Sequence, residues 1–491
     1  MGCDCSKQRE KESISKPPPA VCSPPKPIRK PVRRKSDTQI SISALAHFTT
    51  LADPFLSYYR VIAPIGHTRA LQVSTVEYLA SQLPCRATTI PKEKLQGKAA
   101  QRLGLTDAAR RLAKFDHPNT LRLLELLQDQ DHFYAVFEGC PGGCLLDFLY
   151  DSRLKKPQLL AMLVFELLSG LAYVHSLGEV HGRMSPGHVL LMAGLGEGLL
   201  HVKIAGFGEL DAVMPSDKLL GERFTSPEGA KKPEADIWSL GLLMYTILAG
   251  KCPYAGETEK ALAAAKQVPV NLSLLRHKDT QLLDLITQCL HSPPTALQLR
   301  THPWLRAHLQ RPVPSVYASV LQQLRSYSPS NPLRDAILHF ILYRLASERQ
   351  YVEVAGVFEY LNPGTGTLEM EDLISAYAKT QPEKQAVATA QQVLLSLDQN
   401  DSESVSYSEF LIAGIGPSVL LSAENIRRAF KCFDRNGNGE VSLEEFKHVL
   451  TVKSGANADR KWRKLLLLAD RTGDGEVDLR EFTQLLLEHG T

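Results

Sequence analysis

The chain has 491 residues, 44% of them hydrophobic, so it is long enough for two or three domains that each bury a core. Its 56 basic and 53 acidic residues nearly cancel, which gives no reason to expect a nucleic acid partner. Nine cysteines without a C-x-x-C pair, and no apolar signal segment, favour a reducing, cytosolic setting over a disulfide framework. No uncharged apolar run reaches about eighteen residues, so no membrane-spanning helix is expected.

The first residues match a lipidation pattern. Loss of Met1 would expose Gly2 to myristoylation, with Ser6 at the required offset, and Cys3 and Cys5 would then accept palmitate. Because a single myristoyl chain anchors a protein only marginally, stable binding needs a second signal. The two cysteines supply one such signal.

The rest of the tail, residues 1–52, is rich in proline and basic residues and is typical of a disordered segment. Its basic cluster consists of Lys26, Arg29, Lys30, Arg33, Arg34 and Lys35. Each charge is worth about 1 kcal/mol near an anionic leaflet, and phosphorylation of the adjacent Ser36 would weaken that attraction. We expect the acylated basic tail to hold the protein at the cytoplasmic face of a membrane; an ordinary disordered tail is the alternative.

Two segments near the carboxyl end have the spacing of calcium-binding EF-hand loops. Calcium takes six to eight oxygens, which such a loop supplies from positions 1, 3, 5, 7, 9 and 12, while a glycine at position 6 permits a sharp turn. The first segment offers Asp434, Asn436, Asn438, Glu440 and Glu445, with Gly439 at the turn. The second offers Asp470, Thr472, Asp474, Glu476 and Glu481, with Gly475 at the turn. We expect both loops to bind calcium and to pair through short strands at Val441 and its counterpart.

The 36-residue period of these loops leads back to a further copy. Its ligand positions hold Asp398, Asn400, Ser402, Ser404 and Glu409. Glu403 replaces the turn glycine, and a residue with a Cβ enters the left-handed region at a cost of about 1 kcal/mol. Weaker binding is expected here, so the chain should take two or three calcium ions.

The earliest copy lies around residues 358–373. Gly366 and Leu368 match positions 6 and 8, but Leu361, Pro363 and Thr365 stand where oxygen ligands are needed. We expect a structural hand that completes a pair without an ion.

The middle of the chain carries a series of landmarks between about residues 58 and 306. They are Asp116-His117-Pro118-Asn119, Gly142-Gly143, Ser226-Pro227-Glu228, Asp236-Ile237-Trp238-Ser239-Leu240-Gly241, Pro253 and His302-Pro303-Trp304. In this order they resemble a serine/threonine protein kinase domain. With four EF-hands after it, the chain resembles the calcium-dependent protein kinase family of plants and alveolates. The resemblance implies an α+β bilobal kinase-like domain over 53–306, a junction over 307–352 and an all-α calmodulin-like domain over 353–491.

The phosphate-binding residues of that family are replaced. The glycine-rich loop G-x-G-x-x-G keeps Gly66, but Thr68 and Leu71 stand at its other two glycines. In the A-x-K strand, Thr88 stands at the lysine that pairs the phosphates, and Ala108 stands at the glutamate that receives this lysine. Both halves of that ion pair are therefore absent.

The catalytic residues of the family are replaced as well. In the loop H-R-D-L-K-P-E-N, Arg183 stands at the aspartate that accepts the hydroxyl proton, Ser185 at the lysine and His188 at the metal-binding asparagine. Gly206 stands at the magnesium-binding aspartate of D-F-G. A permanently charged guanidinium cannot accept a proton, and one lost preorganised group typically costs about 10² to 10³ in rate.

We therefore expect a pseudokinase without catalytic residues that binds neither ATP nor magnesium. Two alternatives stay open. One is a calcium-dependent serine/threonine kinase with residual activity, in which Lys92 or Lys94 replaces the lost lysine. The other is a plain calcium-binding protein whose kinase-like part is inert.

The junction contains a predicted amphipathic helix. After Pro332, apolar residues recur at Leu333, Ile337, Phe340, Ile341 and Leu345. In the resembled family a junction segment blocks the active site at low calcium. We expect calcium to open the last EF-hand pair, whose apolar groove captures this helix and repositions the kinase-like lobe toward an unidentified protein partner. A helix that simply belongs to the core is the alternative.

Overall fold

The computed structural model describes the greater part of the chain. Described are residues 49–50, 54–67, 71–79, 82–95, 99–195, 200–207, 218–254, 256, 258–309, 313–328, 332–345, 348–362, 365–399, 402–450 and 456–487. The lipidation residues Gly2, Cys3 and Cys5 lie outside this part, as do the basic cluster with Ser36 and the loop residue Asn400.

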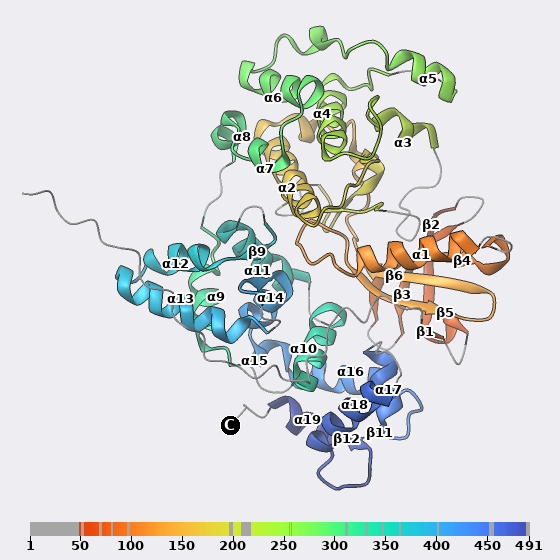
Figure 1. Ribbon diagram of the computed structural model, residues 1–491, viewed down its shortest axis with the longest axis vertical. Helices are drawn as coiled ribbons and strands as arrows, with labels where there is room; N and C mark the ends of the chain where they lie inside the picture. Colours follow the sequence, from red (N-terminus) through yellow and green to blue (C-terminus); the bar gives the residue numbers. More distant parts are fainter. Residues whose placement is uncertain are drawn as a thin grey trace, which may run out of the picture. The chain divides into compact units, whose positions relative to one another are not determined.

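The amino-terminal lobe is a six-stranded sheet in the order β1-β5-β6-β4-β3-β2, with one helix, α1 (Figure 1). Its elements are β1 Thr49–Thr50, β2 Tyr59–His67, β3 Gln72–Tyr78, β4 Leu83–Pro91, α1 Ala99–Leu112, β5 Leu123–Gln128 and β6 His132–Glu138. Neighbouring strands are antiparallel except β1 and β5. Along β4, Cys85 and Ala87 belong to one core cluster and Ile90 to another that includes α1, because alternate side chains of a strand point to opposite faces.

The second lobe is mainly helical. Its elements are α2 Pro157–Ser176, β7 Val189–Leu191, β8 Val202–Ile204, α3 Lys218–Phe224, α4 Pro233–Ala249, α5 Glu259–Ala265, α6 Thr280–His291, α7 Ala296–Leu299 and α8 Pro303–His308. Helix α4 starts at Pro233, which suits a first helical turn, and ends at Gly250 in the left-handed conformation with φ 72°. The α+β kinase-like architecture expected from the sequence is confirmed.

Helix α2 is long and apolar but lies in the core. With 20 residues and a mean hydropathy of 1.6, it has the length and composition of a membrane-spanning helix. No membrane-spanning helix is expected from the sequence, because no uncharged apolar run reaches about eighteen residues. In the structure 72% of that window is buried inside the protein, and Glu166 accepts hydrogen bonds from Asn119 and from the amide of Val202. This is the environment of a core helix.

The carboxyl-terminal region is helical, with two small sheets. Its elements are α9 Tyr317–Ser326, α10 Pro332–Arg344, α11 Glu348–Leu361, β9 Thr367–Leu368, α12 Met370–Ala378, α13 Glu383–Leu397, β10 Val405–Ser406, α14 Tyr407–Ile415, α15 Pro417–Leu420, α16 Ala423–Phe433, β11 Glu440–Val441, α17 Leu443–Val449, α18 Ala456–Ala469, β12 Val477–Asp478 and α19 Leu479–Leu487. Strand β9 pairs with β10 and β11 with β12, with Val405 opposite Leu368 and Val441 opposite Val477. The expected pairing at position 8 of each loop is confirmed.

The helix expected at the junction is α10. Its apolar side chains share one core cluster with the EF-hand helices, and the rings of Phe340 and Phe433 lie 5.0 Å apart. In this structure α10 is therefore part of a core, and its capture by a calcium-opened groove stays a proposal.

Candidate functional site

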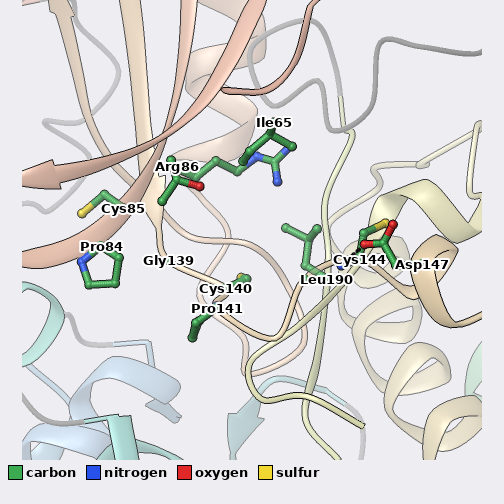
Figure 2. A pocket seen from close by; sticks show the side chains of 12 residues that line it. Ile65, Pro84, Cys85, Arg86, Gly139, Cys140, Pro141, Cys144, Asp147 and Leu190 are labelled. Atoms are coloured by element: carbon green, nitrogen blue, oxygen red, sulfur yellow. Dashed lines mark hydrogen bonds between the residues drawn. The ribbon is translucent and has the colours of Figure 1, made fainter. Parts of the chain in front are cut away.

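A cavity of about 480 Å³ lies where the two lobes of the kinase-like domain meet. Residues of β3 and β4 line one side, and the segment after β6 together with Leu190 of β7 lines the other (Figure 2). The lining residues are Ile65, Thr75, Pro84, Cys85, Arg86, Gly139, Cys140, Pro141, Gly143, Cys144, Asp147 and Leu190. The lining is mostly small and apolar, and Arg86 and Asp147 are its charged members.

Arg86 is the site residue that the sequence reading missed. It stands at the alanine of the A-x-K pattern, is only 7% exposed, and extends toward Ile65 in Figure 2. A long guanidinium side chain at that position occupies space in the cavity and adds a fixed positive charge. The signal was present in the sequence, because the motif places a small residue there.

Thr88 and Ala108 lie where the family has its lysine–glutamate pair, and both are buried. Thr88 in β4 is fully buried, and its hydroxyl oxygen makes no hydrogen bond with any described residue. Ala108 of α1 belongs to the apolar core. Lys92, one of the two proposed substitutes, donates instead to the carbonyl of Asp129, and its ammonium lies 4.9 Å from the centre of the Phe133 ring. Neither a lysine nor a carboxylate replaces the lost pair among these residues.

Hydrogen bonds fix the backbone of the loop that corresponds to the catalytic loop of the family. The fully buried carboxylate of Asp236 accepts from the amide of His181 at 3.0 Å and from that of Gly182 at 2.6 Å. The His181 ring nitrogen Nε2 lies 2.8 Å from the carbonyl oxygen of Ala205. Arg183, at the position of the catalytic aspartate, is exposed. The loop therefore keeps its scaffold although its chemical groups have changed.

His188 and Gly206 occupy the position of the family's metal site together. Gly206 has φ +94°, and a Cβ added to it would lie 2.1 Å from Cδ2 of His188. The other side of the ring is fixed by Ser185, whose hydroxyl lies 2.9 Å from Nδ1. Burial, and to a lesser degree the neighbouring His181, lowers the pKa of His188 to about 3, so the ring is neutral at physiological pH. The imidazole thus fills the space into which an aspartate at position 206 would project.

The third and fourth EF-hand loops, which begin at Asp434 and Asp470, have the same internal geometry. The Asp434 carboxylate accepts from the amides of Gly437 and Gly439, and Asp470 accepts from those of Gly473 and Gly475. These four glycines have φ between 72° and 94°, the left-handed region that glycine enters without strain. Both first-position carboxylates are therefore turned into their loops, as a calcium ligand set requires.

The pKa values of two acidic ligands of the third loop, Glu445 and Glu440, are shifted in opposite directions. Burial opposes ionisation of Glu445, but hydrogen bonds from Ser442, Asn436 and Arg435 outweigh it and lower its pKa. The Glu440 side chain meets that of Glu476 across the two loops, which raises the pKa of Glu440. A cation between facing carboxylates would relieve this repulsion. Within the described ranges no three His, Cys, Asp or Glu side chains converge, because the loops also rely on amide, hydroxyl and carbonyl oxygens.

The second loop, which begins at Asp398, has the expected strained turn. Glu403 has φ +64°, and the Asp398 carboxylate accepts from the amides of Ser402 and Glu403. Burial raises the pKa of Glu409, the last ligand, to about 7, although Ser406 and Gln399 donate to it. Calcium would therefore have to displace a proton from this carboxylate at neutral pH.

In the first hand a side-chain amide takes the place of an ion. The sequence did not predict this. Nδ2 of Asn362 donates to the Thr365 hydroxyl, to the carbonyl of Thr367 and, at 2.9 Å, to the Asp372 carboxylate. Two of these acceptors stand at positions 7 and 12 of the loop, counted from Gly366. An amide NH₂ thus satisfies oxygens that calcium bridges in an intact loop, which explains how this hand keeps its fold.

Comparison with known proteins agrees with this division of the chain. Residues 90–305 match the protein kinase domain, and residues 421–487 match the EF-hand domain pair. This is a kinase-domain protein with EF-hands. The chain is 26% identical over 371 residues to calcium-dependent protein kinase 4 of Plasmodium falciparum, covering 69% of this chain and 70% of that protein. It is also 26% identical over 411 residues to calcium-dependent protein kinase 17 of Arabidopsis thaliana, covering 78% of this chain and 75% of that protein.

The kinase-domain protein is therefore similar to proteins named as calcium-dependent protein kinases, as the sequence indicated. Its EF-hand pair supports calcium binding. The relatives are named as kinases, so the similarity by itself favours a catalytic function as much as a non-catalytic one.

Proposed function

We propose that this protein is a calcium sensor and scaffold whose kinase domain does not transfer phosphate. The observation that carries the proposal is the pair His188 and Gly206. The ligand of the family's magnesium is missing at position 206, and the imidazole of His188 fills the space beside it. Magnesium bound through phosphates requires carboxylate or amide oxygens, and a neutral imidazole with its Nδ1 engaged by Ser185 does not supply them.

Two further observations support the proposal. Arg86 projects into the cavity that would have to admit a nucleotide base, and Thr88 cannot pair phosphates. Catalysis of phosphoryl transfer consists almost entirely of positioning and electrostatic stabilisation. Loss of the metal ligands, the phosphate clamp and the base together leaves no group for that task.

A calcium-dependent serine/threonine kinase is the second candidate. It is favoured by the names of the relatives and by the intact backbone scaffold around Asp236 and His181. An enzyme of this kind would need a metal site built from residues other than those at 188 and 206.

The sensor would act at a membrane and present a surface to a protein partner. The supporting evidence for membrane anchoring is the acylation pattern at Gly2, Cys3 and Cys5, followed by the basic cluster. Calcium would act through the EF-hands, with α10 as the element that shifts. The partner would recognise the kinase-like lobe in its calcium-dependent position.

A thermal-shift experiment on the full chain, with calcium, magnesium and ATP varied independently, tests the non-catalytic function. A ligand that binds only the native state raises the melting temperature, so calcium should raise it and magnesium with ATP should not. A parallel assay should detect no ATP-dependent phosphorylation of a serine/threonine substrate.

The control is Cys140→Trp, which fills the cavity from a partly exposed position and should keep the calcium-induced shift. Calcium-dependent phosphate incorporation that this variant abolishes would establish the kinase and reject the scaffold.

A further inference from the structure

Helix α18 leads into the fourth EF-hand loop and packs against α17 and α19 (Figure 1). Its buried residues are Trp462, Leu465, Leu466 and Ala469, at 2–7% exposure. This spacing of three and four residues is that of a helix with one face in a core. Leu467 and Leu468 lie outside this set and are 68% and 61% exposed.

The two leucines are flanked by cations. Arg463, Lys464 and Arg471 are all exposed. At 3.6 residues per turn, the four helical positions 463, 464, 467 and 468 fall within about 140° of the helix circumference, and Arg471 follows in the loop after the helix ends at Ala469. Arg463 and Leu467, and likewise Lys464 and Leu468, are four residues apart and therefore neighbours on the surface. We call these five residues the α18 stripe.

Single exposed leucines are common on soluble proteins and need no explanation. The α18 stripe differs because two leucines stand side by side, are mostly exposed, and have cations on both sides and no acidic residue within the stripe. Such an arrangement has the chemistry of an interfacial helix, in which apolar side chains enter the acyl boundary and cations face anionic headgroups.

The neighbouring loop makes this surface sensitive to calcium. Asp474 is exposed next to the stripe, and Glu476 and Asp478 are half-buried in the same loop. Without calcium these carboxylates repel an anionic surface. An ion in the loop adds two positive charges there and weakens this repulsion.

We propose that the α18 stripe is a calcium-dependent contact for an anionic lipid surface, separate from the acylated tail. The observations favour lipid over an acidic peptide because the leucines protrude from a helix surface, and insertion into lipid buries them without requiring a complementary pocket. The inference does not rest on the proposed scaffold function, since an active kinase could carry the same surface.

The experiment uses the full chain without its other membrane signals. In this background Gly2 is replaced by Ala and the six residues of the basic cluster by Gln, so that neither acyl chain nor tail charge contributes. Flotation with vesicles of phosphatidylcholine, with and without 30% phosphatidylserine, is measured in calcium and in chelator. Binding is expected only with both phosphatidylserine and calcium.

Within that background, Leu467→Ser/Leu468→Ser and Arg463→Gln/Lys464→Gln should each weaken vesicle binding at least tenfold, since one cation near the surface contributes about fivefold. The matched control, Leu395→Ser/Lys384→Gln, changes an exposed leucine and an exposed lysine of α13 and should bind as the background does. Calcium titration and melting curves confirm that every variant is folded.

Three results would overturn the proposal. The first is that the background chain does not bind vesicles. The second is that the variants of the α18 stripe bind vesicles as strongly as the background chain. The third is that the chain binds poly-glutamate but not vesicles.

Discussion

At the scale of single residues, His188 and Gly206 constrain each other by packing. A side chain at 206 would meet the His188 ring at 2.1 Å and would have to adopt φ +94°. The two residues are thus coupled by packing, and the return of an aspartate at 206 requires a change at 188 as well.

We expect Gly206→Ala to destabilise the kinase-like domain by about 2 kcal/mol or more, from overpacking and backbone strain together. The same change made with His188→Ala should cost less, because only the backbone strain remains. Unfolding in urea is followed by tryptophan fluorescence with Trp462 replaced by Phe, so that only Trp238 and Trp304 of the kinase-like domain report. If Gly206→Ala lowered the free energy of unfolding equally with and without His188→Ala, the His188 ring would not fill this space.

At the scale of elements, the four EF-hands share a helix–loop–helix plan but differ in the chemistry of their loops. Loops three and four have glycine at the turn and ligand oxygens directed inward. Loop two has the oxygens but a glutamate at the turn, and the first hand has an asparagine amide among its acceptors. In the first hand, hydrogen bonds from that amide take the place of an ion.

Glu403→Gly should strengthen calcium binding by the second loop up to about fivefold, because glycine adopts the left-handed turn without the strain of roughly 1 kcal/mol. The measurement is a calorimetric calcium titration with Glu445→Gln and Glu481→Gln, which silence the third and fourth loops. The converse control is Gly439→Ala in the otherwise native chain, which should weaken calcium binding by the third loop. An unchanged affinity after Glu403→Gly would mean that turn strain does not limit binding.

At the scale of the whole molecule, a polar contact joins the second EF-hand to the kinase-like domain. The Asp116 carboxylate accepts from the amide of Ser408 at 3.1 Å and from its hydroxyl at 2.7 Å, and it also pairs with Arg122 at 2.6 Å. Burial opposes ionisation of Asp116, but Arg122 and Ser408 outweigh it and lower its pKa. Ser408 directly precedes the last ligand of the second loop, Glu409, so calcium in that loop acts next to this contact.

Ser408→Ala should reduce the calcium-induced rise in the unfolding midpoint of the kinase-like domain, again reported by Trp238 and Trp304. A hydrogen bond to a charged group contributes about 1.5–3 kcal/mol to stability, and this bond would transmit the effect of calcium in the second loop to the kinase-like domain. Ser319→Ala, at an exposed position of α9, is the control and should leave the calcium effect intact. A calcium response that survives in Ser408→Ala would place the coupling elsewhere.

The sequence alone located the EF-hand loops, because residue type and spacing within a short segment decide their chemistry, and in the same way it predicted the loss of the catalytic groups. It also gave the bilobal fold, through landmarks whose order is diagnostic. Hydropathy alone does not show whether a helix such as α2 is covered by protein or by lipid, and the structure shows that protein covers most of it.

Only the tertiary structure placed Arg86 in the cavity, the His188 ring beside Gly206 and Ser408 on Asp116. These contacts join residues that are distant in the chain, or depend on the direction of a side chain. The periodicity of a single segment carries no information about either. Close packing in a core restricts each side chain to a few conformations. The neighbouring residues, rather than the residue itself, impose that restriction.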